Sequence, residues 1–137
     1  MSKVQNKYAL ISVSDKSNIE NISRSLVDLG YKILSTGGTA KYLTSMNIPN
    51  VSVSDFTKFE EILGGRVKTL HPKIHAGILA KSLKDLEDCS DVYELIDIVI
   101  VNLYPFEKTI SNSNCKYEDA IENIDIGGVA LIRAAAK

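Results

Sequence analysis

The stretch from Gly64 to Pro72, with the sequence GGRVKTLHP, gathers two fixed positive charges, a hydroxyl and an imidazole within a few residues. Adjacent glycines lose much backbone entropy inside a helix, so the pair that opens the stretch predicts a loop. In an extended backbone Arg66 and Lys68 project to the same side, while Val67 points the other way. Such a loop is suited to an anionic ligand, although two basic residues after a turn are also typical of an ordinary solvated surface loop.

A second glycine pair lies in the stretch Ser35-Thr36-Gly37-Gly38-Thr39, which follows the short apolar run at residues 31–34. A strand that leads through this stretch into a helix brings backbone N–H groups and hydroxyls to a helix N-terminus, where unpaired donors and the helix dipole favour an anion. Phosphate is the expected ligand. The stretch lacks the Walker lysine and the three-glycine dinucleotide fingerprint, so a plain strand-to-helix turn is the alternative.

Length and composition narrow the possible classes of function. With 137 residues the chain has the size of one domain, which we expect to span residues 1–137. Its 16 Lys and Arg against 17 Asp and Glu give a formal charge of -1, which does not indicate a nucleic-acid partner. No segment approaches membrane-spanning length, and the N-terminus lacks the apolar run of a signal peptide. We therefore expect a cytoplasmic protein with no membrane partner.

The cysteines and histidines do not predict a metal site. Cys89 and Cys115 stand alone, without the spacing of a zinc site or the density of a disulfide scaffold, so two reduced thiols are expected. His71 and His75 are four residues apart, but Pro72 lies between them and no carboxylate follows in a metalloprotease pattern. We expect no metal and no organic cofactor.

Alternating apolar runs and amphipathic segments predict an α/β domain in which a doubly wound, mostly parallel sheet forms the middle of three layers. Strands are expected at residues 8–13, 31–34, 51–53 and 96–101, the last of them central because it is continuous and β-branched. Helices are expected from the caps Ser14 and Asp15 to Gly30, at 40–46, from the caps Ser54 and Asp55 through Leu63, from Pro72 to about residue 79, at 117–124 and at 129–137. Residues 81–91 are polar and predict a surface helix or loop.

Further polar groups follow the strand at 96–101. Asn102 and Tyr104 stand at its C-terminal end, where ligands bind in open α/β sheets, although a strand-ending turn with a packed tyrosine is the alternative. Asp125-Ile126-Gly127-Gly128 again places an acid and a glycine pair before a helix. That helix reaches Lys137 through three alanines without a C-cap, which predicts a chain cut within a longer domain.

Five motifs together resemble the inosine monophosphate cyclohydrolase domain at the N-terminus of the PurH family of bifunctional purine biosynthesis proteins. They are SVSDK at 12–16, STGGT at 35–39, GRVKTLHP at 65–72, NLYPF at 102–106, and DIGG with RAAAK between 125 and 137. Their order across nearly the whole chain makes the resemblance specific. It implies the methylglyoxal-synthase-like fold and a purine ribotide as the small-molecule partner.

The family's reaction closes a purine ring with loss of water and without a metal or an organic cofactor. The full-length family proteins are dimeric, so the resemblance implies a homodimer for the parent protein. The family's transformylase domain is absent from this sequence, which implies a C-terminally truncated cyclohydrolase domain.

The resemblance also implies a role for individual residues. It assigns the phosphate of the substrate to Ser14, Asp15, Lys16, Thr36, Gly37, Gly38 and Thr39. It assigns the base to Arg66, Val67, Lys68, Thr69, Asn102, Leu103, Asp125, Ile126 and Gly127. Lys137 is implied to be the proton donor and acceptor, assisted by Lys68, Tyr104 and Asp125. Lys68 and the Thr69 amide suit the oxyanion that develops during ring closure.

Two other functions remain as alternatives. A non-catalytic, regulatory module of the same fold would bind a phosphorylated metabolite, and the stretch at 35–39 alone would support it. A methylglyoxal synthase is less favoured because dihydroxyacetone phosphate is much smaller than the base-lined site implied by Asn102, Tyr104 and Asp125.

Overall fold

The computed structural model describes residues 5–89 and 93–137. Within these ranges four strands form one parallel sheet in the order β3-β2-β1-β4. The strands are β1 (Lys7–Ser12), β2 (Tyr31–Ser35), β3 (Val51–Ser52) and β4 (Ile96–Val101). The predicted α/β class with a parallel sheet is confirmed.

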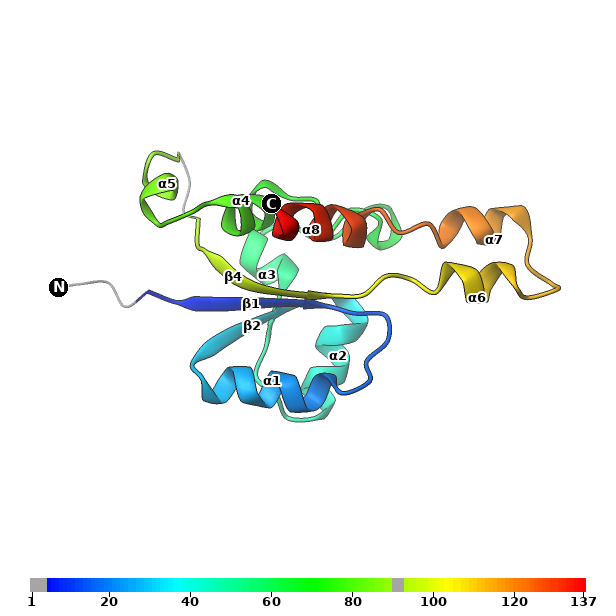
Figure 1. Ribbon diagram of the computed structural model, residues 1–137, viewed down its shortest axis with the longest axis horizontal. Coiled ribbons are helices and arrows are strands. Elements are labelled where there is room, and N and C mark those ends of the chain that lie inside the picture. The colour runs from blue at the N-terminus through cyan, green and yellow to red at the C-terminus, as the bar shows by residue number, and fades with distance from the viewer. Residues whose placement is uncertain (1–4, 90–92) are drawn as a thin grey trace.

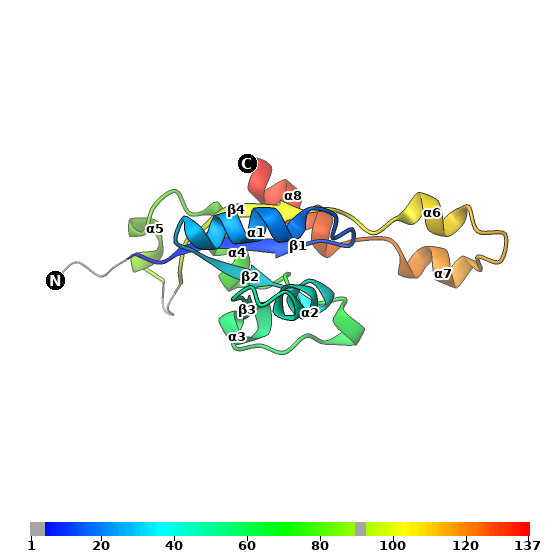
Figure 2. The same ribbon diagram turned by 90° about the horizontal axis from the view of Figure 1, so that it is seen from below.

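Helices cover both faces of this sheet, which confirms the three-layer prediction (Figure 1). One face carries α1 (Ile19–Asp28) and α2 (Gly37–Ser45). The other carries α3 (Val53–Thr57), α4 (Pro72–Leu79) and α8 (Gly127–Ala136), as the turned view also shows (Figure 2). Two short helices, α6 (Phe106–Ile110) and α7 (Tyr117–Glu122), project from the body beyond the carboxyl ends of the strands.

The alternation of side chains along β1 explains the unbroken apolar run at its residues 8–11. Ala9 and Ile11 pack into a buried cluster with residues of α1 and α2. Tyr8 and Leu10 point to the opposite face and join residues of α3, α4 and α8. A strand with a helix layer on each side must be apolar at every position, because neither face meets water.

The same argument corrects the prediction for β4, which is an edge strand of the described sheet and not a central one. Ile98 and Ile100 pack against the cluster on the α1 face, while Val99 and Val101 pack against the cluster on the α8 face. Helices on both faces therefore account for the apolar run, and the run does not reveal how many strand neighbours β4 has.

The start of α1 differs from the prediction. Ser14 and Asp15 do not cap it; the Asp15 carboxylate instead accepts hydrogen bonds from the backbone N–H and hydroxyl of Ser17. The N-cap is Asn18, with φ of 61°, so the chain makes one further turn before the helix begins. At the other end Gly30, with φ of 85°, follows the helix as predicted.

The helices α2 and α3 also have different bounds from those expected. α2 begins at Gly37 and not at residue 40, so the glycine pair forms its first turn. α3 begins at Val53, because the Ser52 hydroxyl accepts the Asp55 N–H as an N-cap, and it ends at Thr57 before Lys58 adopts a positive φ of 58°. The prediction of a helix through residue 63 is therefore wrong.

Residues 62–67 instead form a tight turn. Ile62 and Val67 make an antiparallel bridge around the short 3-10 turn Leu63–Gly65. Both glycines of this turn have positive φ, 64° at Gly64 and 85° at Gly65, which explains the residue type at these positions. The predicted loop is confirmed, and its two ends are tied together.

The remaining predicted helices are present with small shifts of their ends. α4 has Pro72 at its first position and His71 as N-cap, whose Nδ1 accepts the Lys73 N–H. α7 and α8 end two and one residues before the predicted ends at 124 and 137, and α6 was not predicted. In the polar segment 81–91 the helix α5 (Lys84–Glu87) forms, whereas residues 90 and 91 lie outside the described ranges.

The described ranges contain neither a candidate membrane span nor a candidate metal centre. No helix there is both long and apolar enough to cross a membrane. No group of three or more His, Cys, Asp or Glu side chains there is arranged to hold a metal ion.

Candidate active site

A cavity of about 540 Å³ lies at the carboxyl ends of the strands. The chain runs from β1 outward to β2 and β3 and then returns to place β4 on the other side of β1. Ligands in open α/β folds bind at the crevice where the strand order reverses. The loops after β1 and β4 both line the cavity, so it occupies this crevice.

Most of the predicted site residues line this cavity. They are Ser14, Lys16, Thr36, Gly38, Thr39, Arg66, Lys68, Thr69, Asn102, Tyr104, Asp125, Ile126 and Gly127. They come from five separate stretches of the chain. The fold therefore brings together five loops and helix starts that sequence analysis could only relate by resemblance.

One end of the cavity is formed by the N-terminus of α2 and the end of β1. The hydroxyls of Ser12 and Thr36 are 3.1 Å apart and share a hydrogen bond. The Lys16 ammonium donates to the carbonyls of Val13 and Ser14, 3.3 and 3.2 Å away. A cation, hydroxyls and the N–H groups of a helix N-terminus form the environment that an anion such as phosphate requires.

Thr39 lines the same end but its hydroxyl already has partners. The side chain is only 2% exposed, and its Oγ1 both accepts the Val13 N–H and donates to the Val13 carbonyl. A hydroxyl used twice in this way fixes α2 to the end of β1. The geometry thus gives Thr39 a positioning role, whereas the Thr36 hydroxyl, which shares one hydrogen bond with Ser12, keeps further hydrogen-bonding capacity for a ligand.

Asn102 joins the loop after β4 to the loop after β1. Its Oδ1 accepts the backbone N–H groups of Ser14 and Asp15 at 2.6 and 3.1 Å, and its Nδ2 donates to the Asp15 carbonyl at 2.8 Å. This three-bond contact shapes the crevice. It leaves the Asn102 amide engaged with the backbone, which sequence reasoning did not foresee.

The Asp15 side chain does not line the cavity. Hydrogen bonds from the Ser17 hydroxyl and then from the Ser17 N–H lower the pKa of the Asp15 carboxyl below its usual value. Among the residues assigned to phosphate, Asp15 and Gly37 are outside the cavity lining; Gly37 lines a neighbouring pocket of about 30 Å³.

The cavity is also lined by the loop 64–69 and the start of α8. Lys68 lines the cavity and Thr69, only 3% exposed, closes its floor. Thr69 also limits the approach of α8, because a Cβ on Gly127 would stand 3.2 Å from the Thr69 hydroxyl. Val67 does not line the cavity.

Asp125 has its carboxylate held at the start of α8. One oxygen accepts the Gly128 N–H at 2.7 Å and the other accepts the Tyr104 N–H at 3.2 Å. Each oxygen keeps further lone pairs for a ligand. The carboxylate is therefore oriented toward the cavity by the backbones of two elements.

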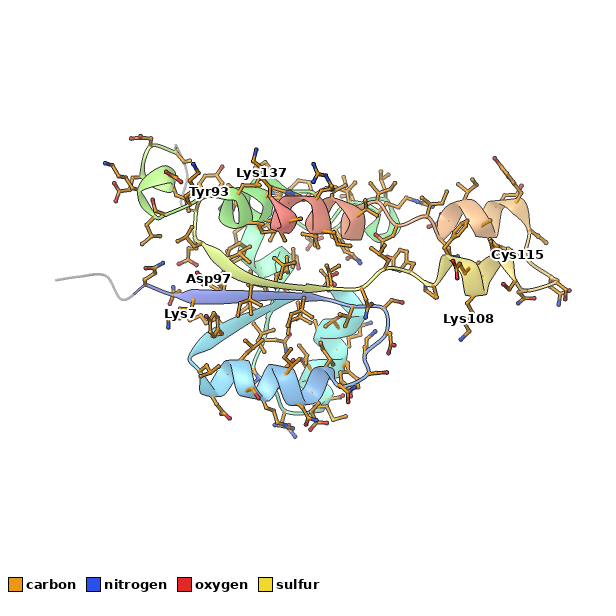
Figure 3. All side chains as sticks on the ribbon, in the orientation of Figure 1. Lys7, Tyr93, Asp97, Lys108, Cys115 and Lys137 are labelled. Carbon is orange, nitrogen blue, oxygen red and sulfur yellow. The ribbon has the colours of Figure 1, made fainter. Side chains whose placement is uncertain are left out.

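Lys137 is not brought to the cavity. It follows the last turn of α8, whereas Gly127 at the first turn lines the cavity, and ten residues of helix span about 15 Å. Figure 3 shows Lys137 at the end of α8 that lies away from the projecting α6 and α7. Leu103 is also outside the cavity lining, and its side chain packs beside Gly128.

Several cavity residues were missed by sequence analysis. They are Ser12, Val13, Gly64, Gly65, Ile121, Glu122, Ile124 and Gly128. The missed residues in the glycine pairs and at the end of β1 are next to predicted residues in the sequence. They could have been included in the predicted site. Ile121, Glu122 and Ile124 belong to the α7 region, and nothing in its amphipathic pattern indicated that it turns toward the cavity.

Comparisons with known proteins agree with this geometry. A profile described as the MGS-like domain matches residues 18–130, and the chain belongs to the MGS-like domain family. The Bifunctional purine biosynthesis protein PurH of Prochlorococcus marinus strain MIT 9215 is 60% identical to it over 134 residues, and that of strain MIT 9515 is 57% identical over 133 residues. The resemblance inferred from the five motifs is confirmed.

These relatives are much longer proteins. Each alignment covers 94% of this chain but 26% of the relative, so the chain spans about a quarter of the length of the curated relatives it matches. Among solved structures, one titled "Crystal structure of ForH" has a TM-score of 0.78 and 31% identity, and the match covers 96% of this chain and 68% of that one.

Proposed function

We propose that this chain is an inosine monophosphate cyclohydrolase domain, which converts 5-formamidoimidazole-4-carboxamide ribotide into inosine monophosphate with loss of water. The observation that carries the proposal is one cavity lined both by the N-terminus of α2 and by Lys68, Tyr104 and Asp125. Identities of 57% and 60% to relatives named for purine biosynthesis support it.

The ribotide phosphate is proposed to bind at the N-terminus of α2. Thr36 and Gly38 stand at the start of this helix, and the Lys16 ammonium lies beside Gly38, 3.7 Å from the position of a Cβ there. The helix dipole, the free N–H groups and the ammonium all favour a dianion. With the phosphate bound there, the base is proposed to occupy the part of the cavity lined by Tyr104 and Asp125, within reach of Lys68.

Ring closure forms a bond between the carboxamide nitrogen and the formyl carbon. The formyl oxygen gains negative charge during the attack and leaves as water after it has received two protons, one given up by the carboxamide nitrogen and one by the formamido nitrogen, which then forms the double bond to the former formyl carbon. The Lys68 ammonium and the Thr69 amide are suited to the oxyanion, since fixed donors stabilise developing charge. The Asp125 carboxylate is suited to accept a carboxamide N–H, which orients the nitrogen for attack.

Tyr104 lies at the cavity wall. In this scheme its phenol donates a proton to the leaving oxygen. Lys137 has no part in it because it lies outside the cavity lining. Its role as proton donor and acceptor stays a prediction that depends on the family resemblance alone.

The test is turnover of the formamido ribotide, followed by the ultraviolet absorbance of the purine ring. We expect turnover that Lys68→Met reduces at least tenfold with little change in affinity for inosine monophosphate. Lys73→Met, which changes the same residue type outside the cavity lining, serves as the control. Absence of turnover, or a Lys68→Met defect confined to affinity, would count against the catalytic proposal.

A second candidate is a non-catalytic module that binds a phosphorylated metabolite. It is favoured by the position of Lys137 away from a cavity whose anion-binding end is nonetheless complete. Such a module would bind inosine monophosphate or ribose 5-phosphate with an affinity that depends on Thr36 and Lys16. It would show no ring closure, and Asp125→Asn would leave its affinity for ribose 5-phosphate unchanged.

A further inference from the structure

Arg66 and Glu122 form an ion pair at the cavity. The Arg66 guanidinium donates to the Glu122 carboxylate at 2.5 Å, and the two residues are 56 positions apart in the chain. Both residues line the cavity, Arg66 from the turn before Lys68 and Glu122 from the last residue of α7. The ion pair therefore connects two walls of the site that belong to different parts of the fold.

The Arg66 side of this contact is anchored. A second guanidinium nitrogen of Arg66 donates to the Leu63 carbonyl at 3.0 Å, within the turn closed by the Ile62–Val67 bridge. The arginine is thus held at two points, one on its own turn and one on α7. An arginine fixed by two hydrogen bonds has lost most of its rotamer freedom before any ligand arrives.

The Glu122 side belongs to a segment with few other attachments to the body. α6 and α7 pack on each other and project past the ends of the strands (Figures 1 and 2). Glu122 lies at the end of α7 that returns to the sheet, directly before the segment that carries Asp125. The ion pair therefore ties the base of this projection to the 62–67 turn.

The same part of the chain supplies an apolar wall. Ile121 and Ile124 line the cavity on either side of Glu122 in the sequence, and both are nearly half exposed, at 49% and 47%. Large apolar side chains that face a cavity and remain exposed offer a surface for a flat, weakly polar group. The cavity that holds Lys68 and Asp125 thus also has an apolar wall for a heterocycle.

We propose that Glu122 is a positioning residue that holds Arg66 and the Ile121–Ile124 wall in place, and so determines affinity for the base of the ligand but not for its phosphate. The inference rests on the proposed function, because it takes a purine ribotide as the ligand. Glu122 does not touch the reacting atoms in this account. It acts through the guanidinium and through the position of α7.

The effect is expected to be modest, because both side chains are more than half exposed, at 60% for Arg66 and 56% for Glu122. Exposed ion pairs contribute little, which corresponds to a change of about two- to fivefold in an equilibrium constant. The informative result is therefore which part of the ligand loses affinity. We expect the loss at the base and not at the phosphate.

The test uses Glu122→Gln, which removes the charge and keeps the shape, with Glu118→Gln as matched control. Glu118 lies one turn earlier on α7, is exposed, and is not among the cavity-lining residues. Calorimetric titration compares inosine monophosphate with ribose 5-phosphate. We expect Glu122→Gln to weaken the binding of inosine monophosphate about three- to fivefold and the binding of ribose 5-phosphate by less than about 1.5-fold. Glu118→Gln should change neither affinity.

Hydrogen exchange of the unliganded protein gives a second, independent readout. The amides of residues 117–124 should exchange faster in Glu122→Gln than in the parent or in Glu118→Gln, because the tie to the 62–67 turn is lost. Equal effects on both ligands, or unchanged exchange, would overturn the inference. If the parent chain binds neither ligand, the proposed function fails, and the exchange comparison still decides whether Glu122 holds α7.

Discussion

The carboxylate of Asp125 lies directly over the backbone of Gly128, with Oδ1 2.7 Å from the Gly128 nitrogen. A Cβ at position 128 would stand 2.8 and 2.9 Å from the two carboxylate oxygens and 2.9 Å from Leu103. The second glycine of the DIGG motif is thus required by the acid that precedes it. The pair fixes the direction in which Asp125 faces the cavity.

Gly128→Ala should therefore displace the Asp125 carboxylate. Overpacking of this kind costs about 1–3 kcal/mol, which exceeds the gain in helix propensity from alanine. We expect a lower midpoint in chemical denaturation and, if the proposed reaction holds, a loss of turnover larger than the loss of ligand affinity. Ala135→Ser, an exposed change in the same helix, is the control. A variant as stable and active as the parent would show that the carboxylate has room to move.

Thr39→Val and Thr36→Val should separate two roles that the sequence motif groups together. Thr39→Val removes both hydrogen bonds to Val13 and leaves a buried N–H without its partner, at a cost of about 1–3 kcal/mol in the free energy of unfolding. Thr36→Val should affect stability less and weaken phosphate binding more. Denaturation curves and phosphate titrations of both variants make the comparison, and the reverse order of effects would contradict it.

Asn102→Ala should loosen the crevice between the loops after β1 and β4. The variant loses three hydrogen bonds to Ser14 and Asp15, and the exposed setting limits the cost to about 1 kcal/mol. We expect faster amide exchange at residues 14–17 and weaker binding of inorganic phosphate. Asn112→Ala, which removes one local bond in the α6–α7 connection, should change neither.

Tyr8 should ionise only at unusually high pH. Burial first, and then the neighbouring Glu94 carboxylate, raise the pKa of its phenol well above the ordinary value near 10. Below pH 10 the folded and unfolded states both keep this proton. Above it the unfolded state loses the proton first, so the stability contributed by neutral Tyr8 declines as pH rises.

An absorbance titration of the tyrosines at alkaline pH measures this effect. We expect a late phase that coincides with unfolding and is missing in Tyr8→Phe. If Tyr8→Phe leaves the titration curve unchanged, the phenol is not protected in the folded state.

Local patterns predicted the fold class because each buried strand meets a helix layer on both faces. Tyr8 to Ile11 are apolar at every position for this reason, and so are residues 98–101 of β4. The number of strand neighbours leaves no such trace in the sequence, which is why β4 was expected in the centre and stands at an edge. Helix ends set by left-handed residues such as Asn18 and Lys58 were missed, since neither is a glycine.

The site was predictable where a polar residue follows a strand. Ser14, Thr36 and Asn102 meet at the cavity because parallel strands end at the same edge of the sheet. Glu122 gave no such indication, since its approach to Arg66 depends on how α6 and α7 fold back. Lys137 is the opposite case. It is close to the site motifs in the sequence, but the ten-residue helix α8 places it away from the cavity.

The pairing of β1 with β4 has a consequence for the folding kinetics of this domain. Tyr8 pairs with Ile96 across nearly ninety positions, and the walls of the cavity come together only when this contact is made. Contacts between residues so far apart in the chain form slowly, because the entropy of closing a long loop is lost before any packing is gained. A nascent or partly unfolded chain therefore has no crevice to offer. Ligand binding should follow the last step of refolding, and bound ligand should slow unfolding by stabilising this long-range pairing.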